Sequence, residues 1–166
     1  MKSKFITLLL LVLLAKFSYA QPYLLRNEQE IFSFSTANGK RVVLAKDRSD
    51  AYIIYRFGTK SKVEFEFPAK TKESWKQFKY SFDIRGGGTM NEGLDLNYIY
   101  FENKGYQYVI YDNYIAADKR SYVGIYVINL KNNHTTDIKG LYSTRKGTMS
   151  DFRDNGLLQI GDQIFD

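Results

Sequence analysis

The stretch Lys62-Val63-Glu64-Phe65-Glu66-Phe67 decides the fold class of this chain, because charged and apolar side chains alternate along it without exception. Alternation with a period of two places the apolar side chains on one face of an extended strand and the charged ones on the other. Residues 77–85 repeat the pattern, with an apolar side chain at every second position from Phe78 to Ile84. Each of these segments predicts a half-buried β-strand.

Seven other segments predict strands in the same way, by alternation and by their content of β-branched and aromatic residues. They span residues 30–35, 40–46, 51–57, 94–102, 106–115, 121–129 and 135–139. Turn-forming residues such as Asn38-Gly39 and Asn103-Lys104-Gly105 separate them. Short connections of this kind join antiparallel neighbours, since a parallel return needs about a dozen residues or more. We therefore expect an all-β antiparallel meander that closes into a small barrel of about eight strands, with a β-sandwich as the alternative.

Two segments do not follow the alternation. Residues 70–76 contain Trp75 and predict a short helical turn or a long loop between two strands. The tail at 141–166 has few periodic positions, and its apolar run at 157–160 is compatible with either a last short strand or an irregular end. The tail is therefore the part of the chain for which the pattern predicts least.

The first twenty residues have the pattern of a secretory signal peptide. Two lysines precede an apolar run that ends at Lys16, and small residues stand at Ser18 and Ala20. The run is too short for a membrane-spanning helix, which needs about 20 apolar residues. We predict a signal peptide over residues 1–20 that is cleaved after Ala20, and a single all-β domain over residues 21–166. The product is expected to be secreted or periplasmic, without a membrane anchor.

The composition excludes several classes of site. The 166 residues include no cysteine and one histidine, His134, so a disulfide framework, a cysteine nucleophile and any site with two imidazoles are ruled out. We expect no metal and no cofactor. The chain has 24 basic and 18 acidic side chains, but three of the lysines lie in the predicted signal peptide. The remaining basic excess is small, and secretion argues against a nucleic-acid partner.

A glycine-rich loop, Arg85-Gly86-Gly87-Gly88, follows the predicted strand at 77–85. Backbone amides of a glycine loop beside an arginine can bind a phosphate or a carboxylate. No Gly-Lys-Ser/Thr follows the glycines, so the sequence does not form a nucleotide-binding P-loop. The loop is a candidate contact for an anion or an acidic peptide, and the alternative is a plain connection between two strands.

Polar side chains occupy one end of a predicted strand face. Asp95 and Asn97 share that face with Ile99 and Phe101, which indicates a strand that leaves the core at one end of the barrel. Asp112 lies on the adjoining predicted hairpin strand, so Asp95 and Asp112 are a pair of carboxylates on facing strands. Two carboxylates about 5 to 9 Å apart can carry out glycoside hydrolysis. The alternative is that both accept hydrogen bonds and stabilise the rim of the barrel.

Tyrosine is used more distinctively than any other residue, with eight tyrosines between Tyr98 and Tyr126. Exposed tyrosine supplies rigid contact area for a protein or a sugar, whereas buried tyrosine packs across neighbouring strands. Tyr98, Tyr111 and Tyr114 are candidates for a binding face, beside the polar residues Asp95, Asn97 and Asp112.

In outline, a small secreted β-meander resembles the periplasmic lysozyme-inhibitor barrels, which block a hydrolase by inserting a loop. The resemblance is one of architecture: the Ser-Gly-x-x-Tyr loop and the cysteines of that family are absent, so no site residue is carried over. We predict a soluble binding module, not an enzyme, whose partner is another protein of the cell envelope or outside the cell. An inhibitor or immunity-type factor for an envelope-active enzyme is one example. The alternatives are a calycin-like carrier of a small apolar or aromatic ligand, and a hydrolase that uses Asp95 and Asp112.

Overall fold

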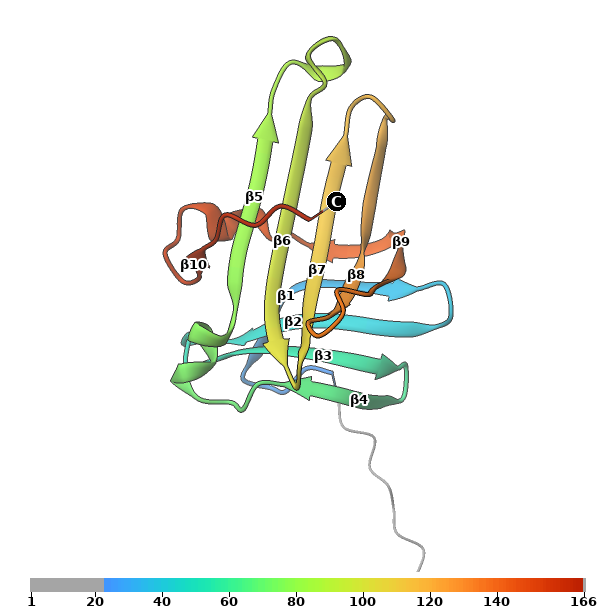
Figure 1. Ribbon diagram of the computed structural model, residues 1–166. Coiled ribbons are helices and arrows are strands. Elements are labelled where there is room, and N and C mark those ends of the chain that lie inside the picture. The colour runs from blue at the N-terminus through green and yellow to red at the C-terminus, as the bar shows by residue number, and fades with distance from the viewer. Residues whose placement is uncertain (1–22, 166) are drawn as a thin grey trace, which may run out of the picture.

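Residues 23–165, which the computed structural model of the chain describes, form a single ten-stranded sheet that curls into a half-barrel (Figure 1). The strands are β1 (Glu28–Thr36), β2 (Lys40–Asp47), β3 (Ile53–Thr59), β4 (Lys62–Phe67), β5 (Lys79–Arg85), β6 (Leu94–Asn103), β7 (Tyr106–Ile115), β8 (Arg120–Asn129), β9 (Thr135–Gly147) and β10 (Gln159–Ile160). Three short 3-10 helices lie between them, η1 (Lys72–Gln77), η2 (Gly88–Asn91) and η3 (Ser150–Arg153). The all-β prediction is confirmed. The predicted signal peptide lies outside the described residues.

The nine segments predicted as strands are all strands, and β7 has the predicted bounds. The segment predicted as a helical turn or long loop, residues 70–76, forms most of η1, which ends one residue later at Gln77. β10 is the last short strand that the tail pattern left undecided, and it is the one strand of the described chain that pairs parallel to its neighbour. β9 extends eight residues past its predicted end at Lys139. The alternation is lost there because this part of β9 no longer pairs with β8 but with β1, in the other half of the sheet.

The sheet consists of two meanders that β9 joins. Its order is β10-β5-β6-β7-β8-β9-β1-β2-β3-β4, so β1 lies between β2 and β9. The first part of β9 pairs with β8 from Thr135 to Lys139, and the second part pairs with β1 from Gly140 to Gly147. The expected barrel closure is replaced by this β9–β1 junction, and in the hydrogen-bonded order of the described strands β4 and β10 are the two ends. Figure 1 shows the result: β5 to β8 stand upright side by side with alternating direction, and β1 to β4 cross below them.

A glycine makes the turn of β9 possible. A side chain at Gly140 would come within 2.5 Å of the Phe34 ring and 2.8 Å of Val123. Both neighbours are buried in the core, so neither can move away at low cost. Gly140 therefore stands where the two halves of the sheet approach most closely, as glycine commonly does at barrel corners.

Aromatic side chains fill the concave, inner side of the sheet. Phe67 on β4 stacks on Phe101 of β6 with ring centroids 4.5 Å apart, and Phe101 stacks in turn on Tyr108 of β7 at 5.0 Å. Phe65 also lies 5.3 Å from Tyr108. The end strand β4 thus closes over β6 and β7 through side chains rather than backbone hydrogen bonds. Burial of large aromatic area at this contact stabilises the curl of the sheet.

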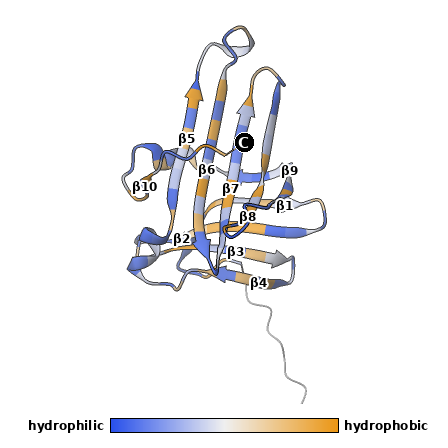
Figure 2. Cartoon of the chain, viewed as in Figure 1, coloured by the Kyte–Doolittle hydropathy of each residue, from blue (hydrophilic) through white to orange (hydrophobic). Residues whose placement is uncertain are grey.

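The outer face carries two further apolar clusters, and Figure 2 shows apolar and polar residues alternating along the strands. Below, Val43, Ala45 and Ile54 pack with Tyr23 and Tyr52. Above, four buried residues of β6 and β7 gather under the C-terminal segment: Tyr98, Tyr100, Val109 and Tyr111. In residues 23–165 no helix has the length and apolar character needed to span a membrane.

Candidate functional site

The inner face of β5 to β8 changes from apolar to polar toward its upper end. Cross-strand pairing places its residues in rows that run from β5 to β8, and the row of Tyr80, Ile99, Ile110 and Ile125 belongs to the core. The next row is Phe82, Asn97, Asp112 and Val123, and the last is Ile84, Asp95, Tyr114 and Ser121. We refer to these last two rows, together with Tyr142, Arg145 and Arg153, as the upper face.

Arg145 and Asp112 form a two-pronged ion pair on the upper face. The Nε of Arg145 donates to both carboxylate oxygens of Asp112, at 2.9 and 3.0 Å, and its Nη2 donates to Oδ2 at 2.5 Å. The Arg145 side chain is 27% exposed and that of Asp112 is 10% exposed. Hydrogen bonding to the Asp112 carboxylate raises the pKa of the Arg145 guanidinium.

A second network joins the polar residues of β6 to η3. The Nη2 of Arg153 donates to Asp95 Oδ1 and to Asn97 Oδ1, the latter at 2.8 Å. The side-chain amide of Asn97 donates to Asp95 Oδ1 at 2.8 Å and to the Asp112 carbonyl at 3.1 Å. Tyr80 closes the network from the core side, donating to Asn97 Oδ1 at 2.5 Å. Burial raises the pKa of Tyr80, so its hydroxyl remains protonated and continues to donate.

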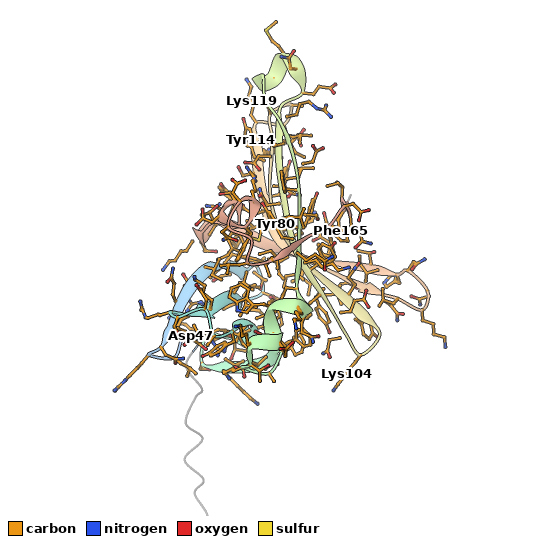
Figure 3. All side chains as sticks on the ribbon, turned by 90° about the vertical axis from the view of Figure 1, so that its left-hand side faces the viewer. Asp47, Tyr80, Lys104, Tyr114, Lys119 and Phe165 are labelled. Carbon is orange, nitrogen blue, oxygen red and sulfur yellow. The ribbon has the colours of Figure 1, made fainter. Side chains whose placement is uncertain are left out.

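Exposed apolar side chains surround these ion pairs. Ile84 is 57% exposed, Tyr114 45% and Tyr142 44%. Tyr114 and Tyr142 line a shallow cavity of about 150 Å³ together with Asp95, Asp112 and Arg145. Figure 3 shows Tyr114 high on the projecting strands and Tyr80 below it. The cavity is too small to enclose a drug-sized ligand, for which pockets of about 300 Å³ or more are typical.

The structure brings four of the predicted site residues together and separates the others. Asp95, Asn97, Asp112 and Tyr114 all lie on the upper face. Tyr98 and Tyr111 are buried in the outer cluster instead, with 1% and 4% exposure. Their hydroxyls donate to the Phe165 carbonyl at 2.7 Å and to Asp137 Oδ1 at 2.9 Å. These two tyrosines therefore pack the sheet on the side opposite the upper face.

The glycine-rich loop forms the tip of the β5–β6 hairpin, above the upper face. Gly87 and Gly88 have positive φ values of 100° and 59°. The Gly93 N–H donates to the Gly88 carbonyl at 2.7 Å, which turns that amide into the loop. Arg85, the residue before the glycines, lies 3.6 Å from Glu92. Gly86 has nothing within 4 Å of where a Cβ would be, so this part of the tip is open.

The sequence showed Arg145 and Arg153 as basic residues of the tail but did not connect them with Asp95 and Asp112, and it gave no sign of Tyr142. All three belong to the tail beyond Lys139, where the chain follows neither a strand nor a helix period for long enough to predict its direction. One signal was available: Asp95 and Asn97 share a face with core residues, and a carboxylate at the edge of a core requires a partner. The pattern could not indicate which basic residue supplies it.

The ion pairs limit the chemistry available on this face. Each carboxylate, Asp95 and Asp112, is hydrogen-bonded to an arginine, which occupies its oxygens with contacts inside the protein. Within residues 23–165 no three histidine, aspartate or glutamate side chains come close enough together to hold a metal ion. The upper face thus combines charge, hydrogen-bonding groups and exposed apolar side chains.

A larger hollow, of about 970 Å³, lies on the outer face beside β10. Polar residues such as Lys79, Gln107 and Gln163 contribute to its lining. The inner side of the half-barrel is occupied by the aromatic core, so the carrier alternative gains no support from the interior. Compared with protein-family models, with curated proteins and with solved structures, the chain gives no match.

Proposed function

We propose that this chain is a secreted binding module that engages another protein through the upper face. The observation that carries the proposal is the group of exposed apolar side chains on this face: Tyr114 and Tyr142 line one cavity with Arg145 and Asp112, and Ile84 lies across from Asp95. Tyrosine and arginine are enriched at protein–protein contacts, where a large flat side chain and a fork of donors bury area and give specificity together.

The hydrogen-bond network supports this function by holding the face in one arrangement before a partner arrives. Asn97 is 5% exposed, and its side chain bonds to Asp95, Tyr80, Arg153 and the backbone of Asp112. A face that is already ordered loses less conformational entropy on binding. The projecting tip at Arg85–Gly93 extends the same surface. An inhibitor or immunity-type factor for an envelope-active enzyme remains the class of function that this surface suits best.

A matched pair of variants on β7 tests the proposal. Tyr114 and Tyr106 lie on the same face of β7 and have similar exposure, 45% and 41%, but they stand at opposite ends of the strand. Lys104, two residues before Tyr106 in the sequence, marks the lower end in Figure 3. We expect Tyr114→Ala to reduce recovery of a stoichiometric partner from envelope extract by about tenfold or more, and Tyr106→Ala to change it by less than about twofold.

Both substitutions remove exposed side chains, so each is expected to change the free energy of unfolding by no more than about 0.5 kcal/mol. A photoreactive amino acid at position 114 identifies the captured protein, and the same label at position 106 serves as the control. The proposal fails if the folded protein recovers no stoichiometric partner, or if the two positions are labelled equally.

A further inference from the structure

The upper part of β5 is an open edge of the sheet. β10 pairs with β5 only at Lys79 and Tyr80, where the Gly161 N–H donates to the Tyr80 carbonyl at 2.8 Å. Backbone groups alternate in direction along a strand, so the N–H and C=O of Phe82 and Ile84 point to the same side as those of Tyr80. In the described chain no strand covers that side above β10, and Figure 1 shows β5 as the outermost of the upright strands.

The other end of the sheet is protected in a way that β5 is not. β4 carries Lys62, Glu64 and Glu66, and its two glutamates form ion pairs with Lys40 and Lys70. Charged side chains on an edge strand discourage pairing unless opposite charges meet across it, and on β4 both glutamates are already paired within the chain. The upper part of β5 instead presents Ile84, which is 57% exposed, at its centre. An exposed edge with an apolar side chain is a template for another strand.

We propose that two copies of the chain pair antiparallel through this edge, with Ile84 opposite Ile84 of the second copy. This register places Asp83 opposite Arg85 of the second copy, and Arg85 opposite its Asp83, so the twofold axis creates two cross-strand ion pairs. It also places Phe82 opposite Gly86, where there is open space for the ring. Opposite charges and an apolar pair directly across two strands are favourable contacts.

Neighbouring registers are unfavourable. A shift that centres the pairing on Asp83 places two carboxylates directly opposite each other, which is destabilising. A shift that centres it on Phe82 places Lys79 opposite Arg85, again like charges, and overlaps the residues that β10 already covers. The sequence Phe82-Asp83-Ile84-Arg85-Gly86 is therefore self-complementary about Ile84. In that register β10 keeps its pairing with Lys79 and Tyr80. The two β5 strands then join the sheets of the two copies into one continuous sheet.

Single cysteines provide a direct test, because the chain has none of its own. Residues opposite each other in a hydrogen-bonded antiparallel pair have Cα atoms about 5.5 Å apart, which is within disulfide range. We expect purified Ile84→Cys to form a covalent dimer under mild oxidation. Ile160→Cys is the matched control, since Ile160 is 48% exposed but lies on β10, away from the twofold axis. It is expected to remain monomeric.

A charge exchange tests the register. In sedimentation equilibrium, Asp83→Arg and Arg85→Asp are each expected to weaken self-association by about tenfold or more, and the double variant to restore it. The pairing is overturned if the wild-type protein is a monomer at every concentration, if the double variant does not recover, or if both cysteine variants cross-link equally. It is also overturned if Ile84→Cys cross-links only to a different protein in envelope extract. The sedimentation and oxidation experiments use purified protein, so self-association can fail in them without any failure of the proposed function.

Discussion

Two arginine clusters occupy the two halves of the molecule, and they differ in access to water. In the lower half, Arg56 is fully buried and donates to both Glu28 oxygens at 2.6 and 2.7 Å, to Glu66 at 2.7 Å and to the Tyr23 carbonyl at 2.8 Å. On the upper face, Arg145 holds the carboxylate of Asp112 and keeps 27% of its side chain exposed.

The difference separates a structural ion pair from a surface available for binding. Around Arg56 the donors point at protein oxygens, and in residues 23–165 no buried side-chain polar atom lacks a partner. An enclosed charge of this kind depends on each partner, because removing one leaves the other without solvation. The Arg145 side chain is partly exposed, so solvent or a second protein can contact it. Three predictions test this contrast, from the largest expected effect to the smallest.

Arg56→Met is expected to lower the free energy of unfolding by about 3–5 kcal/mol, because it leaves the buried Glu28 carboxylate without its partner. Urea denaturation followed by tryptophan fluorescence measures the change. The double variant Arg56→Met/Glu28→Met removes both charges and is expected to lose clearly less than the sum of the two single variants. Additive losses in the double variant would show that the two side chains do not act as a pair.

Acid is expected to weaken the lower half through its carboxylates. Burial raises the pKa of Glu28, but hydrogen bonds from Arg56, the Leu25 N–H and Tyr52 outweigh it, and the net pKa lies below the ordinary 4.5. Hydrogen bonds from Ser49 and Asn27 lower the pKa of Asp47 from 3.8 to about 2. A carboxylate with a lowered pKa stabilises the fold above its ordinary value, and that contribution is lost as pH falls through the folded value.

The urea midpoint should therefore be nearly constant from about pH 7 to pH 5 and then fall steadily toward about pH 2. Asp47→Asn removes a carboxylate whose pKa falls from 3.8 to about 2 on folding. The substitution is expected to make the urea midpoint depend less on pH below about pH 4. A midpoint that rises on acidification, or an unchanged slope in Asp47→Asn, would contradict the assignment.

Arg145→Met is expected to lower the free energy of unfolding by only about 1 kcal/mol, since Asp112 can then bond to water and the ion pair is partly exposed. The amount of partner recovered should fall by a larger factor than the small loss of stability alone would cause. Comparing the urea midpoint with the pull-down yield for the same variant measures both. A stability loss equal to that of Arg56→Met would place Arg145 among the structural arginines.

The strands could be predicted well from the sequence, because apolar and polar residues alternate along a strand that is buried on one face only. Residues 62–67 and 77–85 show this alternation, and both contain a strand of the sheet. Asp95, Asn97 and Asp112 were recognised as one group by the same logic. The alternation does not say which strands are neighbours, so it could not show β1 beside β9 in place of barrel closure.

The position of the two arginines on the upper face could not be predicted from the sequence for a related reason. Arg145 lies in the part of β9 that has turned from one half of the sheet to the other, and Arg153 lies in a four-residue helix. Long-range packing decides the direction of both segments: Phe152 is buried against Tyr80, and Ser35 bonds to Thr144. Such contacts leave no periodic mark in the sequence around them.

The junction between β9 and β1 has a consequence for how the chain acquires its fold. β1 can form its hairpin with β2 as soon as those residues are available, but its other neighbour includes Leu141, which pairs with Ser35. Contacts between residues so far apart in the chain form slowly, because the intervening loop must close first. Until nearly the whole chain has been made, one side of β1 offers unpaired backbone groups to other chains. The last strand to arrive at β1 thus ends the period in which this protein is most prone to aggregate.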